Sequence, residues 1–340
     1  MEIAIFRAAH LRVYLDELRA IGVPVERELG RSRLPSWVEE MPDAYLSLPL
    51  CLEWLARCSR DVELADFSFR AAQRVSLASV SRPLQRAMLD APTGFARMRA
   101  LLRLATLDDS VLAIRMRPEG DRIRVICDLE GLGRNPFLCI AEWLSLQAMV
   151  SIVQSVAGPA WRPAEMTFVA PRRPSVAAQE AYPDTRLLVG QPHSSILVDS
   201  DVLARPSPAI GMRADRSSVG ALGADETFGW SFPAALRSAI RPYLADGYPA
   251  LPLMAEVVGL SSRTLQRRLR RCGRTYSDLV QEARFDLARQ MLVDPAARVI
   301  DVAMAAGYEN PQHFARAFRQ LTGVSPTAYR RSEAAVRHRG

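Results

Sequence analysis

The feature of this 340-residue sequence that most constrains its fold is a segment that occurs twice, 48 residues apart. The first copy covers residues 251–271 and the second covers residues 299–319. In each copy an alanine precedes a glycine by four positions, as Ala255 and Gly259 do in the first and Ala303 and Gly307 in the second. A unit repeated at this interval indicates an internal duplication of a small supersecondary structure.

The first copy has the pattern of a helix-turn-helix. Gly259 can take the left-handed conformation that a tight turn after a short helix requires. Ser261 is placed to cap the next helix, in which Leu265 and Leu269 would point inward, four residues apart. The opposite face of that second helix carries Arg263, Gln266, Arg267 and Arg270.

The second copy repeats the pattern with different residues. Asn310 can cap its second helix, and Pro311 then occupies the first helical position, where its missing N–H costs nothing. The apolar stripe predicted to point inward consists of Phe314, Phe318 and Leu321. The residues left facing outward are Gln312, His313, Arg316 and Arg319.

A single helix is predicted between the two copies, over Tyr276–Leu292, and its 17 residues would be roughly 25 Å long. A rigid spacer of this order could set two recognition helices about one DNA turn, roughly 34 Å, apart. One copy alone could be an ordinary helical hairpin. Together, the copies and the spacer predict an all-α DNA-binding domain over residues 233–334, with helix-turn-helix units at about 251–272 and 299–322.

The charge distribution agrees with a polyanionic partner. The formal net charge is +7, and all 44 basic residues are arginine. Residues 230–340 contain 17 Arg and 9 Asp or Glu, a balance of +8, so the remainder of the chain sums to −1. An excess of positive charge confined to one domain is typical of nucleic-acid binding, although a solvated basic face is the alternative.

The run from Val302 to Arg330 contains Gly-Tyr, Phe-x-Arg-x-Phe and Gly-x-Ser-Pro motifs. With these motifs, residues 232–331 resemble the AraC/XylS family of bacterial transcription regulators. The resemblance implies that the second helix of each unit enters the major groove. It assigns base reading to Arg263, Gln266 and Arg267 in the first unit and to Gln312, His313 and Arg316 in the second. Arg316 could equally contact phosphate, and Arg268, Arg270 and Arg271 suit phosphates or a solvated face.

The first two thirds of the chain has a mixed pattern. Helical spacing of apolar residues predicts helices over Phe6–Ile21, Leu48–Cys58, Arg82–Leu89 and Phe95–Leu107, and an apolar buried helix over Phe137–Val156. Alternation predicts a hairpin of Ser110–Arg117 and Arg122–Leu129 with a turn at residues 118–121, and strands at Glu165–Val169 and Ser195–Asp199. We therefore expect an α+β domain over residues 1–205, followed by a linker over 206–232, where Pro, Ser, Gly and Ala dominate.

Three short stretches of this domain, residues 158–163, 166–171 and 188–196, resemble the arabinose-binding-type N-terminal domain of one AraC subgroup. The resemblance implies a sensor for a small-molecule effector and leaves the identity and contacts of the effector unknown. The chain as a whole is then expected to be a one-component transcription regulator that binds promoter DNA. The resemblance implies that such a regulator works as a homodimer and activates transcription by recruiting RNA polymerase, with repression as the alternative.

Other classes of protein fit less well. No Gly-rich phosphate loop, Gly-x-Ser-x-Gly elbow or paired metal ligands occur, so we expect no enzyme, no cofactor and no metal. The alternative is an enzymatic or repair domain fused to a DNA-binding module, which would require a cysteine cluster with metal spacing; the five cysteines lack it. The N-terminus lacks the features of a signal peptide, and Glu142, Gln147 and Gln154 interrupt the longest apolar run, so a cytoplasmic protein without membrane contact is expected.

Overall fold

The computed structural model describes residues 3–207 and 229–337, apart from residues 76–78, and divides into two compact units. The N-terminal unit comprises Met1–Trp230 and the C-terminal unit comprises Ser231–Gly340. The first is an α+β unit and the second is helical, as the sequence predicted.

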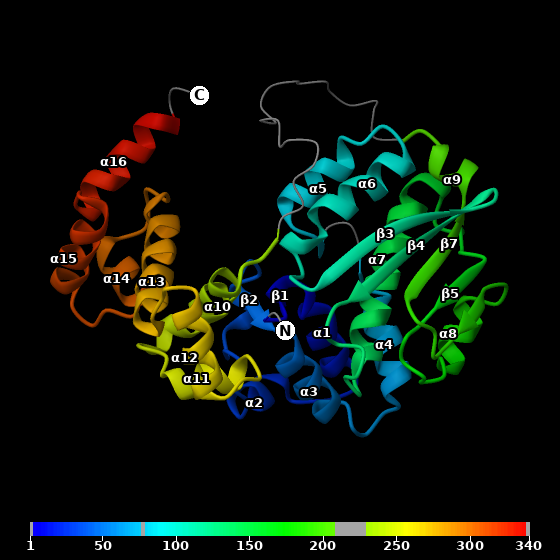
Figure 1. The fold of residues 1–340 in the computed structure, drawn as a ribbon, viewed down its shortest axis with the longest axis horizontal. Helices are drawn as coiled ribbons and strands as arrows, with labels where there is room; N and C mark the ends of the chain where they lie inside the picture. The colour runs from blue at the N-terminus through cyan, green and yellow to red at the C-terminus, as the bar shows by residue number, and fades with distance from the viewer. Residues whose placement is uncertain (1–2, 76–78, 208–228, 338–340) are drawn as a thin grey trace. The chain divides into compact units, whose positions relative to one another are not determined.

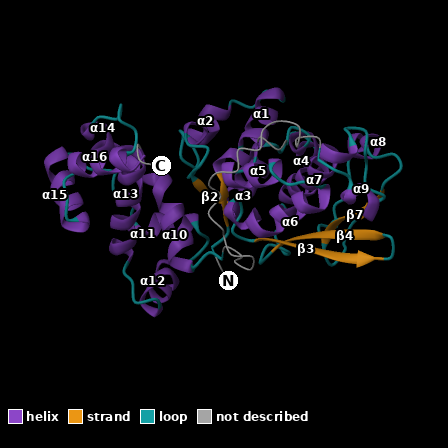
Figure 2. Ribbon diagram, turned by 90° about the horizontal axis from the view of Figure 1, so that it is seen from above, coloured by secondary structure: helices purple, strands orange, loops and turns teal. Residues whose placement is uncertain are grey.

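The N-terminal unit is built on a five-stranded sheet of order β3-β4-β7-β5-β6. Only β5 and β6 run parallel, while the other neighbouring strands are antiparallel. Its strands are β3 (Leu112–Glu119), β4 (Arg122–Leu129), β5 (Glu165–Thr167), β6 (Arg186–Leu188) and β7 (Ser194–Asp199). Figure 2 shows the strands along one side of this unit with helices on the other.

The predicted hairpin is confirmed, with one difference at its turn. Pro118 belongs to β3 and pairs with Ile123, so the connection is reduced to Gly120 and Asp121. Because β3 is an edge strand of the sheet, a residue without an N–H is tolerated there. The alternation that predicted β4 separates its two faces: Val125 and Cys127 are buried in the core, whereas Arg124 points to the opposite face.

The buried helix predicted from the longest apolar run is α7 (Leu138–Ala157). Among the described residues it is the one helix long and apolar enough to cross a membrane by length and composition. Its side chains instead fill the core: Trp143, Met149 and Val153 are each at most 2% exposed and cluster with sheet residues. Packing against a sheet on one side and helices on the others therefore accounts for its all-round hydrophobicity.

The remaining elements of this unit are short helices, 3-10 turns and one separate pair of strands. The helices are α1 (Arg12–Ala20), α2 (Val25–Gly30), α3 (Leu48–Cys58), α4 (Leu64–Ala72), α5 (Arg82–Leu89), α6 (Gly94–Leu104), α8 (Val176–Ala181) and α9 (Ser200–Ala204), with short 3-10 turns η1 (Ala8–His10), η2 (Val38–Glu40) and η4 (Ala105–Leu107). Strands β1 (Ile5–Arg7) and β2 (Tyr45–Ser47) form a separate antiparallel pair.

The helix predicted to begin at Phe6 is wrong in its first turn. Phe6 lies in β1, where it pairs with Leu46, and α1 starts only at Arg12. The reason is a tertiary one, because β1 is held by a strand about forty residues away and local helical spacing carries no information about that partner. The helices predicted at Leu48–Cys58 and Arg82–Leu89 are confirmed at both ends.

Two described residues of the predicted linker, Ser207 and Trp230, contact the N-terminal unit, whereas Ser231 and Phe232 begin the helix Phe232–Ile240. Ser207 donates its backbone N–H to the carbonyl of Pro92 at 2.9 Å, and its hydroxyl accepts from Arg97. Trp230 donates its indole N–H to the carbonyl of Thr106 at 2.6 Å. Residues 208–228, which make up most of that predicted linker, lie outside the described residues.

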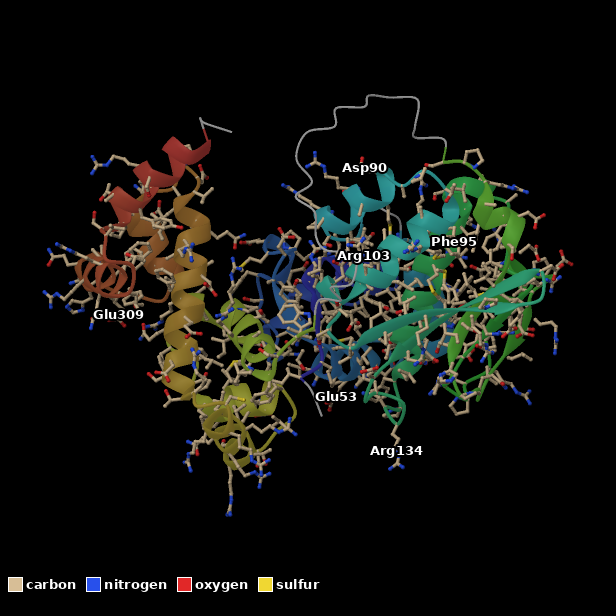
Figure 3. All side chains as sticks on the ribbon, turned by 45° about the horizontal axis from the view of Figure 1, so that its top comes forward. Glu53, Asp90, Phe95, Arg103, Arg134 and Glu309 are labelled. Atoms are coloured by element: carbon tan, nitrogen blue, oxygen red, sulfur yellow. The ribbon has the colours of Figure 1, made fainter. Side chains whose placement is uncertain are left out.

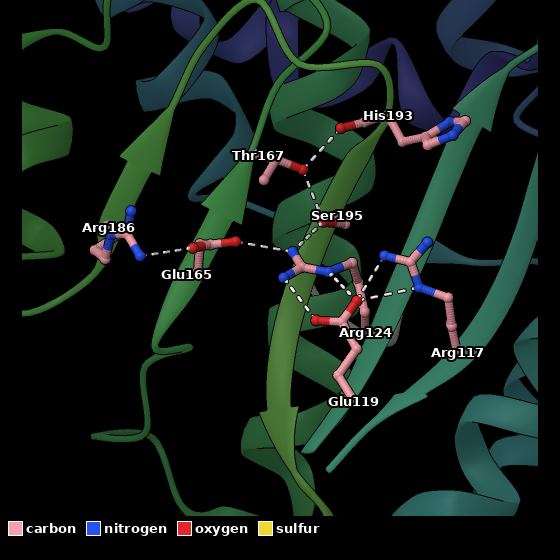
Figure 4. Close-up of polar contacts among 8 residues, drawn as sticks. All are labelled: Arg117, Glu119, Arg124, Glu165, Thr167, Arg186, His193 and Ser195. Atoms are coloured by element: carbon pink, nitrogen blue, oxygen red, sulfur yellow. Dashed lines mark hydrogen bonds and ion pairs between the residues drawn. The ribbon is translucent and has the colours of Figure 1, made fainter. Parts of the chain in front are cut away.

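The outer face of the sheet carries a polar network across all five strands (Figure 4). At its centre, Arg124 reaches Glu119 at 2.8 Å, Glu165 at 2.9 Å and the Ser195 hydroxyl at 3.1 Å. Its members in Figure 4 are Arg117, Glu119, Arg124, Glu165, Thr167, Arg186, His193 and Ser195. Its three arginines share the carboxylates of Glu119 and Glu165, so each charged group has a partner of opposite charge. The network therefore stabilises the sheet face.

Asp109 gives this unit an expected pH dependence. Burial raises the pKa of its carboxyl to about 6, although the side chain accepts a hydrogen bond from the Val111 N–H at 3.1 Å. The pKa of this carboxyl in the unfolded chain is about 3.9, so the folded state binds the proton more tightly than the unfolded state does. The stability that results is fully present below about pH 4 and is lost as the pH rises through about 6. We expect Asp109→Asn to increase the free energy of unfolding by about 3 kcal/mol at pH 7.5 and by little at about pH 3. Urea unfolding at the two pH values measures this, and an equal change at both would contradict the assignment.

The C-terminal unit is all-helical and contains both predicted helix-turn-helix units. Its elements are α10 (Phe232–Ile240), η6 (Arg241–Asp246), α11 (Leu251–Val257), α12 (Ser262–Arg271), α13 (Tyr276–Leu292), α14 (Val299–Ala305), α15 (Pro311–Thr322) and α16 (Pro326–Arg337). The first helix-turn-helix unit is α11–α12 and the second is α14–α15. The spacer helix α13 has the predicted limits and 17 residues, and Figure 1 shows α14 and α15 beside it.

Candidate nucleic-acid interface

The first unit has the predicted turn and cap. Gly259 adopts a φ of +68°, in the left-handed region. The Ser261 hydroxyl accepts a hydrogen bond from the N–H of Thr264 at 3.2 Å, which satisfies one of the free amides at the start of α12. Leu265 and Leu269 are fully buried, at 0% and 1% exposure. These two leucines orient α12 so that its opposite face is left in solvent.

The second unit is built in the same way, with one correction. Asn310 caps α15 by accepting from the N–H of Gln312 at 2.7 Å, and Phe314 and Phe318 are buried. Leu321, predicted to complete this apolar stripe, is 57% exposed. Tyr329 of α16 packs against this cluster instead, and its ring lies 5.6 Å from that of Phe318.

All of the predicted DNA-contacting side chains are exposed on these two helices. On α12 they are Arg263, Gln266, Arg267 and Arg270, and on α15 they are Gln312, His313 and Arg316. Within the part of the chain that the structure describes, none of the seven side chains makes a hydrogen bond or an ion pair. Figure 3 shows nitrogen-tipped side chains extending outward from the α11–α12 end of this unit, and Glu309 at the turn before α15.

Other arginines of the C-terminal unit are neutralised by neighbouring carboxylates. Arg237 lies 3.2 Å from both Glu282 and Asp286. Arg298 pairs with Asp301 at 2.8 Å. The arginines of the unit thus fall into those paired within the fold and those exposed on α12 and α15, which are Arg263, Arg267, Arg270 and Arg316. Free guanidinium and amide groups are the groups that can fork onto guanine and adenine edges or contact phosphates.

Arg268 differs from the other arginines of α12. It is half-buried, and its guanidinium lies over the ring of Phe232 in α10, 5.3 Å from the ring centre. The sequence grouped it with Arg270 and Arg271, which are both exposed. A cation over an aromatic face stabilises packing, so Arg268 joins α12 to α10 in addition to any contact it makes with phosphate. Helical periodicity alone could not show this, because Phe232 is more than thirty residues away.

The N-terminal unit has a groove beside α1 with a volume of about 370 Å³, which is enough for a small molecule. Its lining includes Arg12 and Asp16 of α1, Glu39 of η2, and Arg74. Arg74 also pairs with the buried carboxylate of Glu17 at 2.9 Å. The sequence analysis identified none of these residues, since they come together only through the packing of separate helices.

Two matched helix-turn-helix units joined by one helix, beside a separate α+β domain, define a DNA-binding transcription regulator. The family comparisons agree for both parts of the chain. Residues 254–332 match a helix-turn-helix domain, and residues 22–207 match the arabinose-binding domain of AraC transcription regulators, N-terminal. The chain belongs to the AraC family of transcription regulators, with an N-terminal effector-binding domain and a C-terminal helix-turn-helix DNA-binding domain.

Individual relatives are also transcription regulators. The chain is 23% identical over 335 residues to the regulator VirS of Mycobacterium tuberculosis, covering 96% of each protein. It is 33% identical over 97 residues to the transcriptional activator NphR of a Rhodococcus species, covering 28% of this chain and 29% of that protein. Among solved structures, the regulator CdpR of Pseudomonas aeruginosa matches with a TM-score of 0.39 and 19% identity, over 91% of this chain and 96% of that one.

Proposed function

We propose that this protein activates transcription by reading promoter DNA with α12 and α15 together, under control of a small molecule bound by its N-terminal domain. The observation that carries the DNA-reading part is the pair of exposed, unpaired sets of Arg, Gln and His side chains on two equivalent helices. One recognition helix supplies few side chains and a small interface, so two in one chain increase both affinity and specificity.

The roles proposed for individual residues follow from their chemistry and position. Arg263, Gln266 and Arg267 lie in the first two turns of α12, the part of a recognition helix that faces base edges. Gln312, His313 and Arg316 occupy the same part of α15. Arg270, in the last turn of α12, suits a phosphate contact. The proposed domain limits are residues 1–205 for the effector-binding and dimerisation domain, 206–232 for the linker and 233–334 for DNA binding.

The remaining parts of the proposal concern partners and setting. We propose a cytoplasmic homodimer, because two copies would read paired half-sites and double the DNA interface. Contact with RNA polymerase would account for activation, and the relative NphR is described as an activator. We also propose that the N-terminal domain acts by binding and not by catalysis, as expected for a sensor whose relatives are transcription regulators.

Substitutions on the two recognition helices test base reading. Arg263→Ala or Gln312→Ala should cost about 1–3 kcal/mol of binding free energy on the operator and relax the sequence preference at particular base pairs. The measurement is the dissociation constant for the operator and for its single-base variants, at fixed salt. The operator itself can be obtained by selecting bound sequences from random DNA.

Arg271→Ala is the matched control, since Arg271 is exposed at the C-terminal end of the same helix. It should weaken binding to operator and random DNA alike. It should also reduce the slope of log affinity against log salt concentration by about 1, as expected for the loss of one phosphate contact. If Arg263→Ala and Gln312→Ala also weakened both DNAs equally, the two residues would be phosphate contacts and the base-reading assignment would be wrong.

A further inference from the structure

Arg284 is a buried arginine in the middle of the spacer helix α13, and it faces the second helix-turn-helix unit. It is 9% exposed, and within the described residues it forms no ion pair with a carboxylate. A buried guanidinium is costly unless its hydrogen bonds are satisfied and its charge is compensated. The groups that contact its guanidinium therefore indicate which interactions require an arginine at this position.

The first set of contacts of Arg284 is with the turn of the second unit. One guanidinium nitrogen donates to the carbonyl of Gly307 at 3.1 Å, and the guanidinium lies over the ring of Tyr308, 4.8 Å from its centre. Tyr308 is itself held on α13, because its hydroxyl donates to the Gln281 side chain at 3.0 Å. The turn that precedes α15 is thus bound to α13 through two neighbouring residues, Gly307 and Tyr308.

The second set of contacts leads toward the first unit. The guanidinium of Arg284 also lies 5.6 Å from the ring centre of Tyr248, in the segment that enters α11. Tyr248 makes an edge-on contact with Tyr276 at the start of α13, 6.1 Å between ring centres. The Tyr276 hydroxyl donates to the carbonyl of Pro249 at 2.6 Å. The segment that enters the first unit is therefore fixed to α13. Arg284 contacts both this segment and the turn of the second unit.

The backbone is packed tightly at this point. A Cβ added to Gly307 would lie 2.7 Å from the carbonyl oxygen of Leu244, 3.0 Å from that of Gly247 and 3.1 Å from Arg284. The equivalent glycine of the first unit, Gly259, has nothing within 4 Å of that position. The second turn is therefore docked against the segment preceding α11, whereas the first turn is free.

We propose that Arg284 is a positioning residue that fixes the orientation of α15 relative to α12, so that both helices fit successive major grooves. The length of α13 sets the separation along its axis, but a helix alone does not fix how the α14–α15 pair is rotated about it. Apolar packing of Ala288 and Leu292 against α14 and α15 holds the pair on α13. The contacts of Arg284 with Gly307, Tyr308 and Tyr248 add a restraint at the turn itself. The inference rests on the proposed reading of DNA by both units.

The experiment compares operators of different spacing, using the full-length protein. One base pair inserted between the sequences read by the two units rotates them by about 35° relative to each other. The wild type should bind the inserted operator at least about tenfold more weakly than the native one. Arg284→Met, which removes the donors but keeps much of the volume, should lose about tenfold on the native operator and differ by less than about threefold between the two.

Two further variants make the result specific. Arg284→Lys keeps a donor for Gly307 but loses the planar stacking group, and it should fall between the wild type and Arg284→Met. Arg237→Met is the matched control, because Arg237 of α10 lies outside both helix-turn-helix units and pairs with Glu282 and Asp286 of α13. It should retain the wild-type ratio between the two operators.

Each outcome has a defined meaning. The inference is overturned if Arg284→Met retains the wild-type ratio between operators, whether its affinity falls or not, because Arg284 would then affect stability only. Thermal unfolding of each variant identifies the temperature at which all are folded, and binding is measured below it. If the wild type itself does not distinguish the two operators, the proposed two-unit reading fails, and that result is distinct from a failure of Arg284 to position α15.

Discussion

Ala283→Pro is expected to unfold the DNA-binding domain and abolish operator binding. Ala283 lies near the middle of α13 and is 1% exposed. Proline there removes a backbone donor and its ring collides with the carbonyl four residues earlier, which costs about 3 kcal/mol or more. The second helix-turn-helix unit packs on α13, and the segment that enters the first is hydrogen-bonded to it, so both should be lost together. Circular dichroism during heating should show the C-terminal transition lowered by at least about 10 °C.

Ala283→Gly separates the loss of the helical hydrogen bond from the loss of a side chain. Glycine keeps the backbone N–H and costs about 1 kcal/mol in a helix interior. We expect this variant to be folded and to bind the operator with nearly unchanged affinity at low temperature. If Ala283→Pro were as stable as Ala283→Gly, α13 would not be a continuous rigid spacer. The unfolding transition of the N-terminal domain should be the same in both variants and serves as an internal reference.

Gly307→Ala is expected to have a far larger effect than Gly259→Ala, although the two glycines occupy equivalent places in the duplicated units. Both have positive φ, +74° and +68°, so each alanine incurs a left-handed backbone cost of about 1–2 kcal/mol. Only at Gly307 would the new Cβ also meet two backbone carbonyls. Backbone cannot move aside as a flexible side chain can, so the total loss at Gly307 should be about 3 kcal/mol or more.

Urea unfolding of the two alanine variants and the wild type measures this difference directly. The comparison is internally controlled, because residue type, turn geometry and backbone conformation are matched. A similar loss of stability in both variants would show that the second turn is not packed against the segment before α11. It would also remove the close approach at Gly307 from the support for the positioning role of Arg284.

Much of the DNA-binding domain could be predicted because its signals are local. Ser261 and Asn310 cap helices through amides two or three residues away, and Gly259 turns the chain without help from distant residues. The limits of α13 follow from similar signals: Thr275 and Asp278 form a reciprocal capping box at its start. The exposed faces of α12 and α15 then follow from the positions of their buried residues.

The N-terminal unit was harder to predict, because its short strands depend on distant partners. Strand β1 is only three residues long and exists because β2 pairs with it across about forty residues. Strand β6 has three residues and pairs in parallel with β5 only. By contrast, the β3–β4 hairpin could be recognised because its strands are eight residues long and joined by two residues.

The sequence by itself determined that this chain carries two helix-turn-helix units on a rigid spacer, because duplication, capping and helical periodicity act over a few residues. It also determined that the seven predicted DNA-contacting side chains of α12 and α15 face outward. Only the tertiary structure decided that Arg268 packs on Phe232, that Tyr329 packs on Phe318, and that Arg284 joins the second turn to the spacer. Each of these contacts joins residues far apart in the chain, and the pattern of either segment alone does not specify its partner.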